Sequence, residues 1–420
     1  MLSREAQTVV RATLPIVGTV INDITKRFYE RMFTAEPELL HLFNRGNQAT
    51  NEQARALAGS VAAFATHLVA EPRIDPVRLL GRIAHKHAAV GVLPEQYTIV
   101  GRHLLAAVAE VLGAAATPEI LAAWDEVYWL MACLLVAKES RLNQETGTTT
   151  GIWRPWRVDR RDEEATDVVS FILSAADGAA APVFKSGQYI SVAISLPEGG
   201  RQIRQYSLSD APAAGQWRIT VKRVRGDGAS PDGAISTFLH ESVAVGDLLT
   251  VSAPFGDVVL DDTDSPLLVA SAGIGCTPVM SMLRDLSARQ STRPVQALHA
   301  DHSPRTHALR DDLLSTVEAL PNATLNLWYE DLSDGEAPAG ARAGFVQLRP
   351  DPLPDRLRAY LCGPLPFMRD LRSQLLRRGV PAEQSRYEVF GPDLWLADES
   401  PMADDVASET VSYSPSTTRS

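Results

Sequence analysis

Residues 267–278 read LLVASAGIGCTP, and this stretch decides the fold of the last third of the chain. Its first residues have the length and apolar composition of a buried strand, and two glycines follow closely. Pro278 takes the place of the third glycine of the usual dinucleotide fingerprint and suits the first turn of a helix. A strand, a glycine turn and a helix start together present backbone amides to a phosphate, so the stretch predicts a dinucleotide site. The residues of this turn are Gly273, Ile274, Gly275, Cys276, Thr277 and Pro278.

Strands alternate with helices beyond this turn, which predicts a doubly wound α/β domain with a parallel sheet and its ligand at the carboxyl ends of the strands. Asp301 and Arg305 follow the second strand. An acidic residue there favours a free ribose and a basic residue a 2′-phosphate, so NADH and NADPH both stay open. The expected strands are 267–271, 294–299, 325–329 and 359–362, and the expected helices start at 278 and cover 308–320 and 366–378.

Short β-rich segments bounded by Gly, Pro or Asp precede this domain and predict a six-stranded antiparallel barrel over 152–262. In a strand, Arg204 and Tyr206 share one face because side chains alternate. Together with Ser207 they offer a cation, an aromatic ring and a hydroxyl, which are the groups that a flavin dinucleotide requires. Cross-strand packing is the alternative role for Tyr189 and Tyr206. The expected strands are 167–173, 189–196, 217–224 and 247–253.

Residues 1–145 show only helical periodicity, with helices expected over 21–33, 53–69, 76–90, 94–112 and 118–142. The histidines of this part are His41, His67, His85, His87 and His103. A lone helical histidine is usually packed or solvated. His87 differs because its neighbours at i−4, i−3, i+3 and i+4 are apolar or glycine, so it points into an apolar stripe and is suited to hold a haem. His85, about 200° round the helix, is expected to face water.

The composition fits a globular protein of two or three domains, with 420 residues of which 45% are hydrophobic. The net charge of −11 favours neither nucleic acid nor an anionic membrane as a partner. The longest apolar stretches are shorter than the roughly 20 residues that span a bilayer, and the first residues lack a signal-peptide pattern. The three cysteines are far apart, which predicts neither a disulfide nor a thiolate metal site and indicates a reducing cytosol.

Several helical motifs stand in the order and spacing of a bacterial globin domain. They are Phe28-Tyr29-Glu30-Arg31-Met32-Phe33, Pro37-Glu38-Leu39-Leu40 with Phe43-Asn44, Gln53 with Leu57, Lys86-His87 and Pro94-Glu95-Gln96-Tyr97. With the flavin and dinucleotide motifs, the chain over 1–396 resembles the flavohaemoglobins, which join a globin to a ferredoxin-reductase-type module. The resemblance implies an all-α globin haem domain (1–145), a linker (146–151), an FAD-binding antiparallel β-barrel (152–262), an NAD(P)-binding α/β domain (263–396) and a disordered tail (397–420).

The resemblance also implies haem b as a cofactor and assigns roles around it. His87 becomes the proximal iron ligand and Phe43 packs on the haem, while Tyr97 and Glu139 lie behind His87. A carboxylate that polarises the imidazole raises its basicity. Tyr29, Gln53 and Leu57 form the distal pocket, where a tyrosine hydroxyl stabilises negative charge on oxygen. Outside the family context, Tyr29 fits simple helix packing, Gln53 a solvated position and Glu139 a charged helix end.

For the reductase half, the resemblance implies FAD and either NADH or NADPH. Phe390 would stack on the isoalloxazine until the nicotinamide displaces it, and Lys86 and Glu388 would line the gap between flavin and haem. Cys276 departs from the glutamine common in the family, and residues 229–232 are an insertion before a phosphate-contacting turn. A buried strand end is the alternative role for Cys362. The implied ligand-contacting residues are Tyr189, Arg204, Gln205, Tyr206, Ser207, Ser236, the 273–278 turn, Cys362, Gly363, Pro364, Glu388, Val389, Phe390, Gly391 and Pro392.

The activity implied by the resemblance is that of a nitric oxide dioxygenase. Electrons pass from NAD(P)H to FAD to haem, and O2 and NO become nitrate. The expected partners are these small molecules, with no nucleic acid, no obligate membrane and no separate protein, in the cytoplasm. Two alternatives stay open: a haem and flavin reductase with a different electron donor, and an oxygen store or gas sensor. The polar residues Tyr29, Gln53, Tyr97 and Glu139 argue against the first, and the intact reductase motifs argue against the second.

Overall fold

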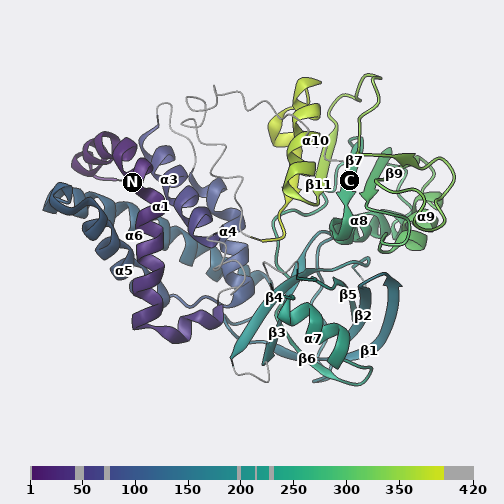
Figure 1. Cartoon of the computed structure of the whole chain (residues 1–420), viewed down its shortest axis with the longest axis horizontal. Helices are drawn as coiled ribbons and strands as arrows, with labels where there is room; N and C mark the ends of the chain where they lie inside the picture. Colours follow the sequence, from purple (N-terminus) through teal and green to yellow (C-terminus); the bar gives the residue numbers. More distant parts are fainter. Residues whose placement is uncertain are drawn as a thin grey trace, which may run out of the picture.

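The computed structural model describes residues 2–42, 52–70, 76–195, 200–212, 215–226 and 231–391. A helical part, an antiparallel sheet and an α/β part follow each other along the chain (Figure 1). The fold class expected from the sequence is therefore confirmed. The predicted tail over 397–420 lies outside the described residues.

The helical part contains the five predicted helices, with differences at their ends. The first helix begins 17 residues earlier than expected, at Arg4, where the Ser3 side chain caps it by accepting from the Ala6 N–H at 3.1 Å. A short 3-10 segment before α3 was not predicted. The elements are α1 (Arg4–Ala35), η1 (Pro37–Leu42), α3 (Glu52–Val69), α4 (Pro76–Val90), α5 (Gln96–Leu112), η2 (Gly113–Ala115) and α6 (Pro118–Glu145).

Two of these helices correct the expectation about apolar stretches. The segments Gln96–Ala115 and Pro118–Glu145 are long and apolar enough, by length and composition, to cross a membrane. The expectation was wrong because it considered uninterrupted apolar runs, whereas a helix of this hydropathy tolerates scattered polar residues. In this fold α5 and α6 pack against α1 and against each other, and Leu104 and Val127 lie in their shared core. Length and composition alone do not separate such a core helix from a membrane span.

The antiparallel sheet has six strands in the order β4-β3-β6-β1-β2-β5, and a bridge between Leu208 and Ile219 links its two ends. Stacked Trp156 and Trp217 lie in its interior, with ring centroids 3.7 Å apart. Strand β1 was not predicted, because its charged residues pair along the exposed face and mask the apolar alternation. The elements are β1 (Arg154–Ala165), β2 (Val168–Ala175), β3 (Tyr189–Ser195), β4 (Arg201–Ser207), β5 (Gln216–Lys222), α7 (Ala234–Ser242) and β6 (Leu248–Val251).

The second sheet is parallel, in the order β10-β9-β8-β7-β11-β12, as alternation predicted. Strand β7 packs apolar side chains on both faces: Val269 belongs to the cluster with α8 and α9, and Leu268 to the cluster with α10. Helix α8 begins at Cys276, two residues before Pro278, and the short strand β12 was not predicted.

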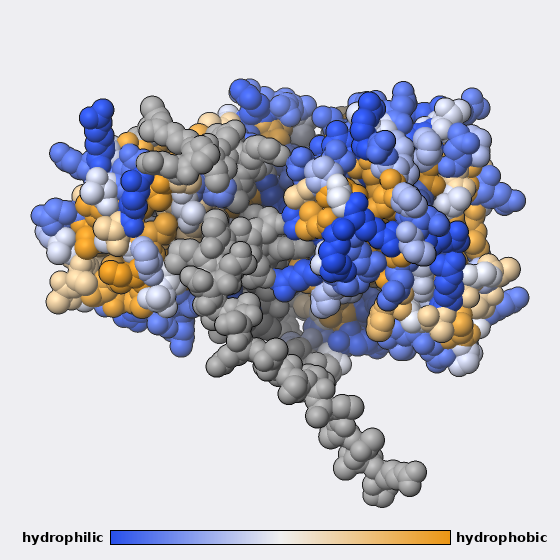
Figure 2. Space-filling model, turned by 90° about the horizontal axis from the view of Figure 1, so that it is seen from above, coloured by the Kyte–Doolittle hydropathy of each residue, from blue (hydrophilic) through white to orange (hydrophobic). Residues whose placement is uncertain are grey.

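The elements of this part are β7 (Leu267–Ala272), η3 (Gly273–Gly275), α8 (Cys276–Ala288), β8 (Val295–Asp301), α9 (Arg310–Glu318), β9 (Ala323–Tyr329), β10 (Arg342–Ala343), β11 (Arg358–Cys362), α10 (Leu365–Arg377), η4 (Ala382–Gln384) and β12 (Ser385–Glu388). Seen from above, hydrophilic side chains dominate the outline of the molecule, and apolar side chains gather in smaller patches (Figure 2).

Candidate functional site

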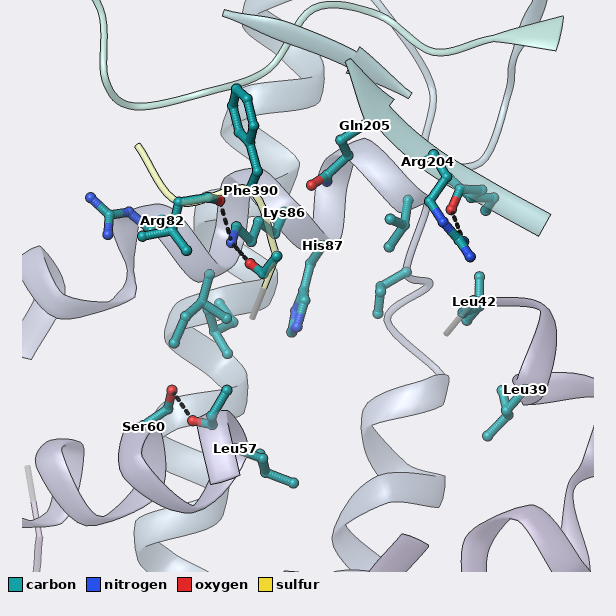
Figure 3. A pocket seen from close by; sticks show the side chains of 18 of the residues that line it. Leu39, Leu42, Leu57, Ser60, Arg82, Lys86, His87, Arg204, Gln205 and Phe390 are labelled. Carbon is teal, nitrogen blue, oxygen red and sulfur yellow. Dashed lines mark hydrogen bonds between the residues drawn. The ribbon is translucent and has the colours of Figure 1, made fainter. Parts of the chain in front are cut away.

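A cavity of ≈ 630 Å³ begins among the helices of the first part and continues to strand β4 of the antiparallel sheet and the segment after β12. Its helical walls come from α1, η1, α3, α4, α5 and α6, and most of its lining is apolar. Figure 3 shows His87 pointing into this space, with Leu57 on one side and Gln205 and Phe390 toward the barrel. One cavity therefore joins the residues expected at a haem to those expected at a flavin.

A partly buried hydrogen-bond network holds His87 at the wall of the cavity. His87 Nδ1 lies 2.8 Å from Tyr97 Oη and 3.0 Å from Glu139 Oε1, and the tyrosine hydroxyl donates to the same carboxylate oxygen at 2.5 Å. Burial, followed by the charge of Glu139, raises the pKa of Tyr97, which keeps the hydroxyl protonated. Because the carboxylate holds the Nδ1 proton, the Nε2 lone pair of His87 is left for a metal.

The distal side contains Tyr29 and Leu57, which both line the cavity. Tyr29 is held between two aromatic rings, with centroids 4.8 Å from that of Phe28 and 5.5 Å from that of Phe33. Burial raises the pKa of Tyr29, so its hydroxyl stays protonated and remains a hydrogen-bond donor. The side chain of Gln53 and the whole of Phe43 lie outside the described residues.

The flavin residues come from two paired strands, in which Tyr189 lies opposite Ser207 and Ile190 opposite Tyr206. The Ser207 Oγ is buried and has no hydrogen-bond partner within the described chain, so a bound group would satisfy it. Burial lowers the pKa of Arg204, whose guanidinium donates to the Ile203 carbonyl at 2.7 Å and to Gln202 Oε1 at 3.2 Å. A bound anion such as a pyrophosphate would stabilise the charged form of this half-buried guanidinium.

Hydrogen bonds of the Ser236 hydroxyl hold the turn before α7 together. Ser236 Oγ donates to the Gly233 carbonyl at 3.0 Å and accepts from the Val224 N–H at 3.1 Å. A Cβ on Gly233 would lie 2.7 Å from this hydroxyl, so the turn closes only around glycine. Of the insertion, Ala229 and Ser230 lie outside the described residues, while the Asp232 carboxylate accepts from the Gly226 N–H at 2.6 Å.

The dinucleotide turn has the geometry expected from its glycines. Gly273 has φ +53°, and a Cβ on Gly275 would lie 2.3 Å from the Cys362 carbonyl oxygen. The turn therefore lies directly against Cys362 and Gly363, as a shared nicotinamide site requires. Thr277 Oγ1 donates to the Ile274 carbonyl at 3.0 Å, and Pro364 occupies the N-cap position of α10. Cys276 and Cys362 are buried free thiols, and burial raises the pKa of both.

Asp301, the last residue of β8, and Arg305 after it do not decide between NADH and NADPH. Burial alone would raise the pKa of Asp301, but interactions with His299, Thr306 and the His302 N–H outweigh it and lower the pKa to about 2. Its carboxylate therefore accepts hydrogen bonds from the loop that follows β8. Arg305 Nε donates to Asp334 Oδ1 at 2.8 Å, so its charge is already partnered.

Comparison with known proteins agrees with this geometry. The globin family model matches residues 26–132, the oxidoreductase FAD-binding domain 155–259 and the oxidoreductase NAD-binding domain 269–373. A flavohemoprotein of Halalkalibacterium halodurans is 41% identical over 94% of this chain and 98% of its own length, and one of Rhizobium meliloti is 40% identical over 94% and 100%. The chain belongs to the flavohaemoprotein family.

Two solved structures extend the likeness of this flavohaemoprotein to three dimensions. The flavohemoglobin of Malassezia yamatoensis, solved with bound FAD and haem, has a TM-score of 0.84 and 35% identity and covers 93% of this chain and 100% of its own. The FAD/NAD-binding domain of a nitric oxide dioxygenase from Vibrio cholerae has a TM-score of 0.52 and 33% identity, over 57% of this chain and 99% of its own.

The segment after β12 is held by the helix that carries His87. Lys86 Nζ donates to the backbone carbonyls of Val389, at 3.5 Å, and Gly391, while Glu388 is buried at 4% exposure (Figure 3). Lys86, Glu388 and Phe390 all line the cavity. Pro392 lies outside the described residues.

His85 does not face water, contrary to the expectation. Its Nδ1 accepts a hydrogen bond from the Gly256 N–H of the barrel at 3.0 Å. The prediction was wrong because helical periodicity shows which face is polar but not whether another domain covers that face. Sequence reasoning also missed Arg82, one turn earlier on α4, which lines the cavity and contacts the reductase half. No local motif marks it.

Proposed function

We propose that this flavohaemoprotein is an NAD(P)H-dependent nitric oxide dioxygenase that uses haem b and FAD. The observation that carries the proposal is the hydrogen-bonded chain of His87, Tyr97 and Glu139 at one end of a cavity whose other end is the flavin strand β4. When bound, haem and FAD supply the redox chemistry that carries electrons from a nicotinamide to O2 and NO, which leave as nitrate.

Around the haem position, each residue has one physical task. His87 Nε2 would hold the iron, and Glu139, which fixes the Nδ1 proton, would make the imidazole a stronger donor of electron density. Tyr29 stays protonated and would donate its hydroxyl to an oxygen species bound on that side of the cavity, where it would stabilise negative charge. Phe43 would pack on the haem face and Gln53 would assist Tyr29, while Leu57 excludes water.

On the reductase side, the residues bind and orient the two dinucleotides. Arg204 holds the flavin pyrophosphate, Ser207 donates its free hydroxyl, and Tyr189, Gln205 and Tyr206 enclose the flavin. The turn before α7, with Ser236, supplies backbone amides. The 273–278 turn and Cys362-Gly363-Pro364 hold the nicotinamide dinucleotide, and Phe390, within 388–392, covers the flavin face.

The domain bounds proposed with this function are 1–145 for the globin, 146–151 for a linker, 152–262 for the FAD barrel and 263–396 for the NAD(P) domain, with a tail over 397–420. Globin and reductase modules share one chain, so electron transfer requires no separate protein. The proposed partners are O2, NO and NAD(P)H, and the proposed location is the cytoplasm.

The test is to mix the haem- and FAD-loaded protein with O2, NO and either NADH or NADPH, and to follow NO loss and nitrate formation. Reductant-dependent NO loss with an equal yield of nitrate is expected. Haem reduction without NO loss would instead favour a reductase or a gas sensor.

Tyr29→Phe tests the distal role. It removes one hydroxyl and leaves the ring, so oxygen should dissociate faster and NO removal should slow by about 10²-fold. Unchanged oxygen dissociation in this variant would contradict the role given to Tyr29.

A further inference from the structure

Arg82 lies where the three domains of the flavohaemoprotein meet. It belongs to α4, the helix that carries His87, and its side chain is only 15% exposed. Its Nη2 donates to the backbone carbonyl of Tyr387 at 2.8 Å, and its guanidinium carbon lies 4.4 Å from the centre of the Tyr387 ring. Its Nε lies 3.9 Å from Asp257 Oδ1. One globin side chain thus contacts the barrel segment after β6 and the last strand of the α/β domain.

The contact with Tyr387 is made by two parts of the same group. The planar guanidinium covers the ring while one of its N–H groups reaches the carbonyl, a combination that lysine cannot reproduce. Tyr387 is itself fixed, since it is 7% exposed and lies opposite Leu361 in the parallel pairing of β12 with β11. Arg82 therefore holds a rigid point of the reductase rather than a loose loop.

This rigid point lies immediately before the residues that close the cavity. Strand β12 ends one residue after Tyr387, and Val389, Phe390 and Gly391 then run along the cavity wall. Phe390 is 50% exposed, so contacts of its own ring hold it weakly. Its place depends on how the backbone leaves β12, and α4 fixes that backbone at Tyr387 through Arg82. It also fixes the backbone at Val389 and Gly391 through Lys86, which Figure 3 shows below Phe390.

We propose that Arg82 is a positioning residue of the reductase: from the globin domain, it fixes the end of β12 and thereby holds Phe390 over the flavin. The inference rests on the proposed function, in which a nicotinamide must displace Phe390 to reach the flavin. It assigns the haem-ligand helix a second role, because the face of α4 away from His87 sets how readily the dinucleotide gains access.

The test measures the NADH kinetics of the full-length haem- and FAD-loaded protein with ferricyanide as electron acceptor. In Arg82→Ala, the backbone before Phe390 loses its contact at Tyr387 and keeps only those of Lys86, so Phe390 competes less with the nicotinamide. We expect the KM for NADH to fall about threefold to tenfold while kcat changes little, from the size of the lost cation–π contact. The KM of Arg82→Lys, which keeps the charge but not the planar contact, should lie between those of the wild type and Arg82→Ala. An unchanged KM in Arg82→Ala overturns the proposal.

A double-mutant cycle decides whether Arg82 acts through Phe390. In a Phe390→Ala background, Arg82→Ala should change KM no further. The same fold-change in both backgrounds would overturn the proposal, because it would show a merely structural effect. If Arg82→Ala does not retain FAD, Arg82→Gln, whose amide still donates to a carbonyl, takes its place in the cycle with the same two outcomes.

Arg102→Ala is the matched control. Arg102 lies on α5, is 63% exposed and bonds Glu36 within the globin, so its loss should leave KM unchanged. The assay contains no NO. If the double-mutant cycle shows the expected coupling but the protein consumes no NO in the separate NO assay, only the dioxygenase function is contradicted. If the protein consumes NO but the effects of Arg82→Ala and Phe390→Ala on KM are additive, only the role of Arg82 is contradicted.

Discussion

The proximal side of the globin cavity and the flavin strand are built in opposite ways. His87, Tyr97 and Glu139 come from three helices, α4, α5 and α6, and meet through hydrogen bonds of 2.5–3.0 Å. Arg204 to Ser207 are consecutive residues of one strand, β4. In the strand, the backbone alone determines which side chains share a face. Among the helices, only packing brings the three side chains together.

This difference predicts how substitutions at each site should combine. The proximal residues share one carboxylate oxygen, so removing one alters the others. In the proposed function the strand residues contact different parts of a dinucleotide, so each should act nearly alone. Coupling between substitutions is therefore the measurement that separates the two designs.

The largest effect is expected for His87→Ala, because it removes the proposed iron ligand. Haem retention should fall by about 100-fold or more, since even outer contacts of a metal site are worth about 10- to 100-fold. Flavin-dependent NADH oxidation with ferricyanide should persist. Haem absorbance of the purified protein gives the first quantity.

His85→Ala is the control for this experiment, because His85 contacts the barrel rather than the proximal network. Equal haem loading of His87→Ala and wild type would contradict the proposal that His87 is the iron ligand.

Glu139→Gln and Tyr97→Phe should each slow NO removal by about 10- to 100-fold, because either change weakens the hold on His87 Nδ1. The double variant should be little worse than the poorer single variant, since both act through one oxygen atom. Stopped-flow NO consumption gives the three rates. Fully additive losses would show that the residues work independently.

Arg204→Ala should weaken FAD binding by about 10- to 100-fold, through loss of a charge-assisted hydrogen bond to the pyrophosphate. Ser207→Ala should have a smaller effect, because it removes one neutral donor. The two losses should add in the double variant, unlike those of the proximal network. Fluorescence titration with FAD measures all three, and strong coupling would contradict the contrast drawn here.

A last effect, on stability rather than on activity or cofactor binding, is expected at a buried pair in the α/β domain, where His307 and His299 stack with centroids 4.1 Å apart. Burial, and then the nearby His299, lower the pKa of His307 from 6.5 to about 2. The unfolded chain binds this proton below about pH 6.5 but the folded chain does not, so stability falls as the pH drops from about 6.5 toward 2, by up to about 1.4 kcal/mol per unit.

His307→Gln should flatten this part of the dependence of unfolding free energy on pH, measured by urea denaturation between pH 7 and pH 4. His302→Gln, at a side chain that is 69% exposed, is the matched control and should leave the slope unchanged. Equal slopes in wild type and His307→Gln would show that the histidine does not titrate on unfolding.

Local patterns predicted the elements that carry their own signal. The glycine turn after β7 and the strand β4 lie where expected, because a close backbone approach at Gly275 and side-chain alternation are short-range requirements. The strands that the sequence did not predict are those that depend on pairing with other segments. Strand β1 pairs its charges along an exposed face, and the short β12 gains its hydrogen bonds from β11.

The order of the three modules, the turn chemistry and the apolar stripe into which His87 points were predictable from the sequence alone, because each is marked by residues that lie close together in the chain. The tertiary structure decided that one cavity joins the haem and flavin positions, that His85 contacts the barrel, and that Arg82 contacts Tyr387. Residues about 170 and 305 positions apart in the chain make these last two contacts, and no local preference fixes such a distance.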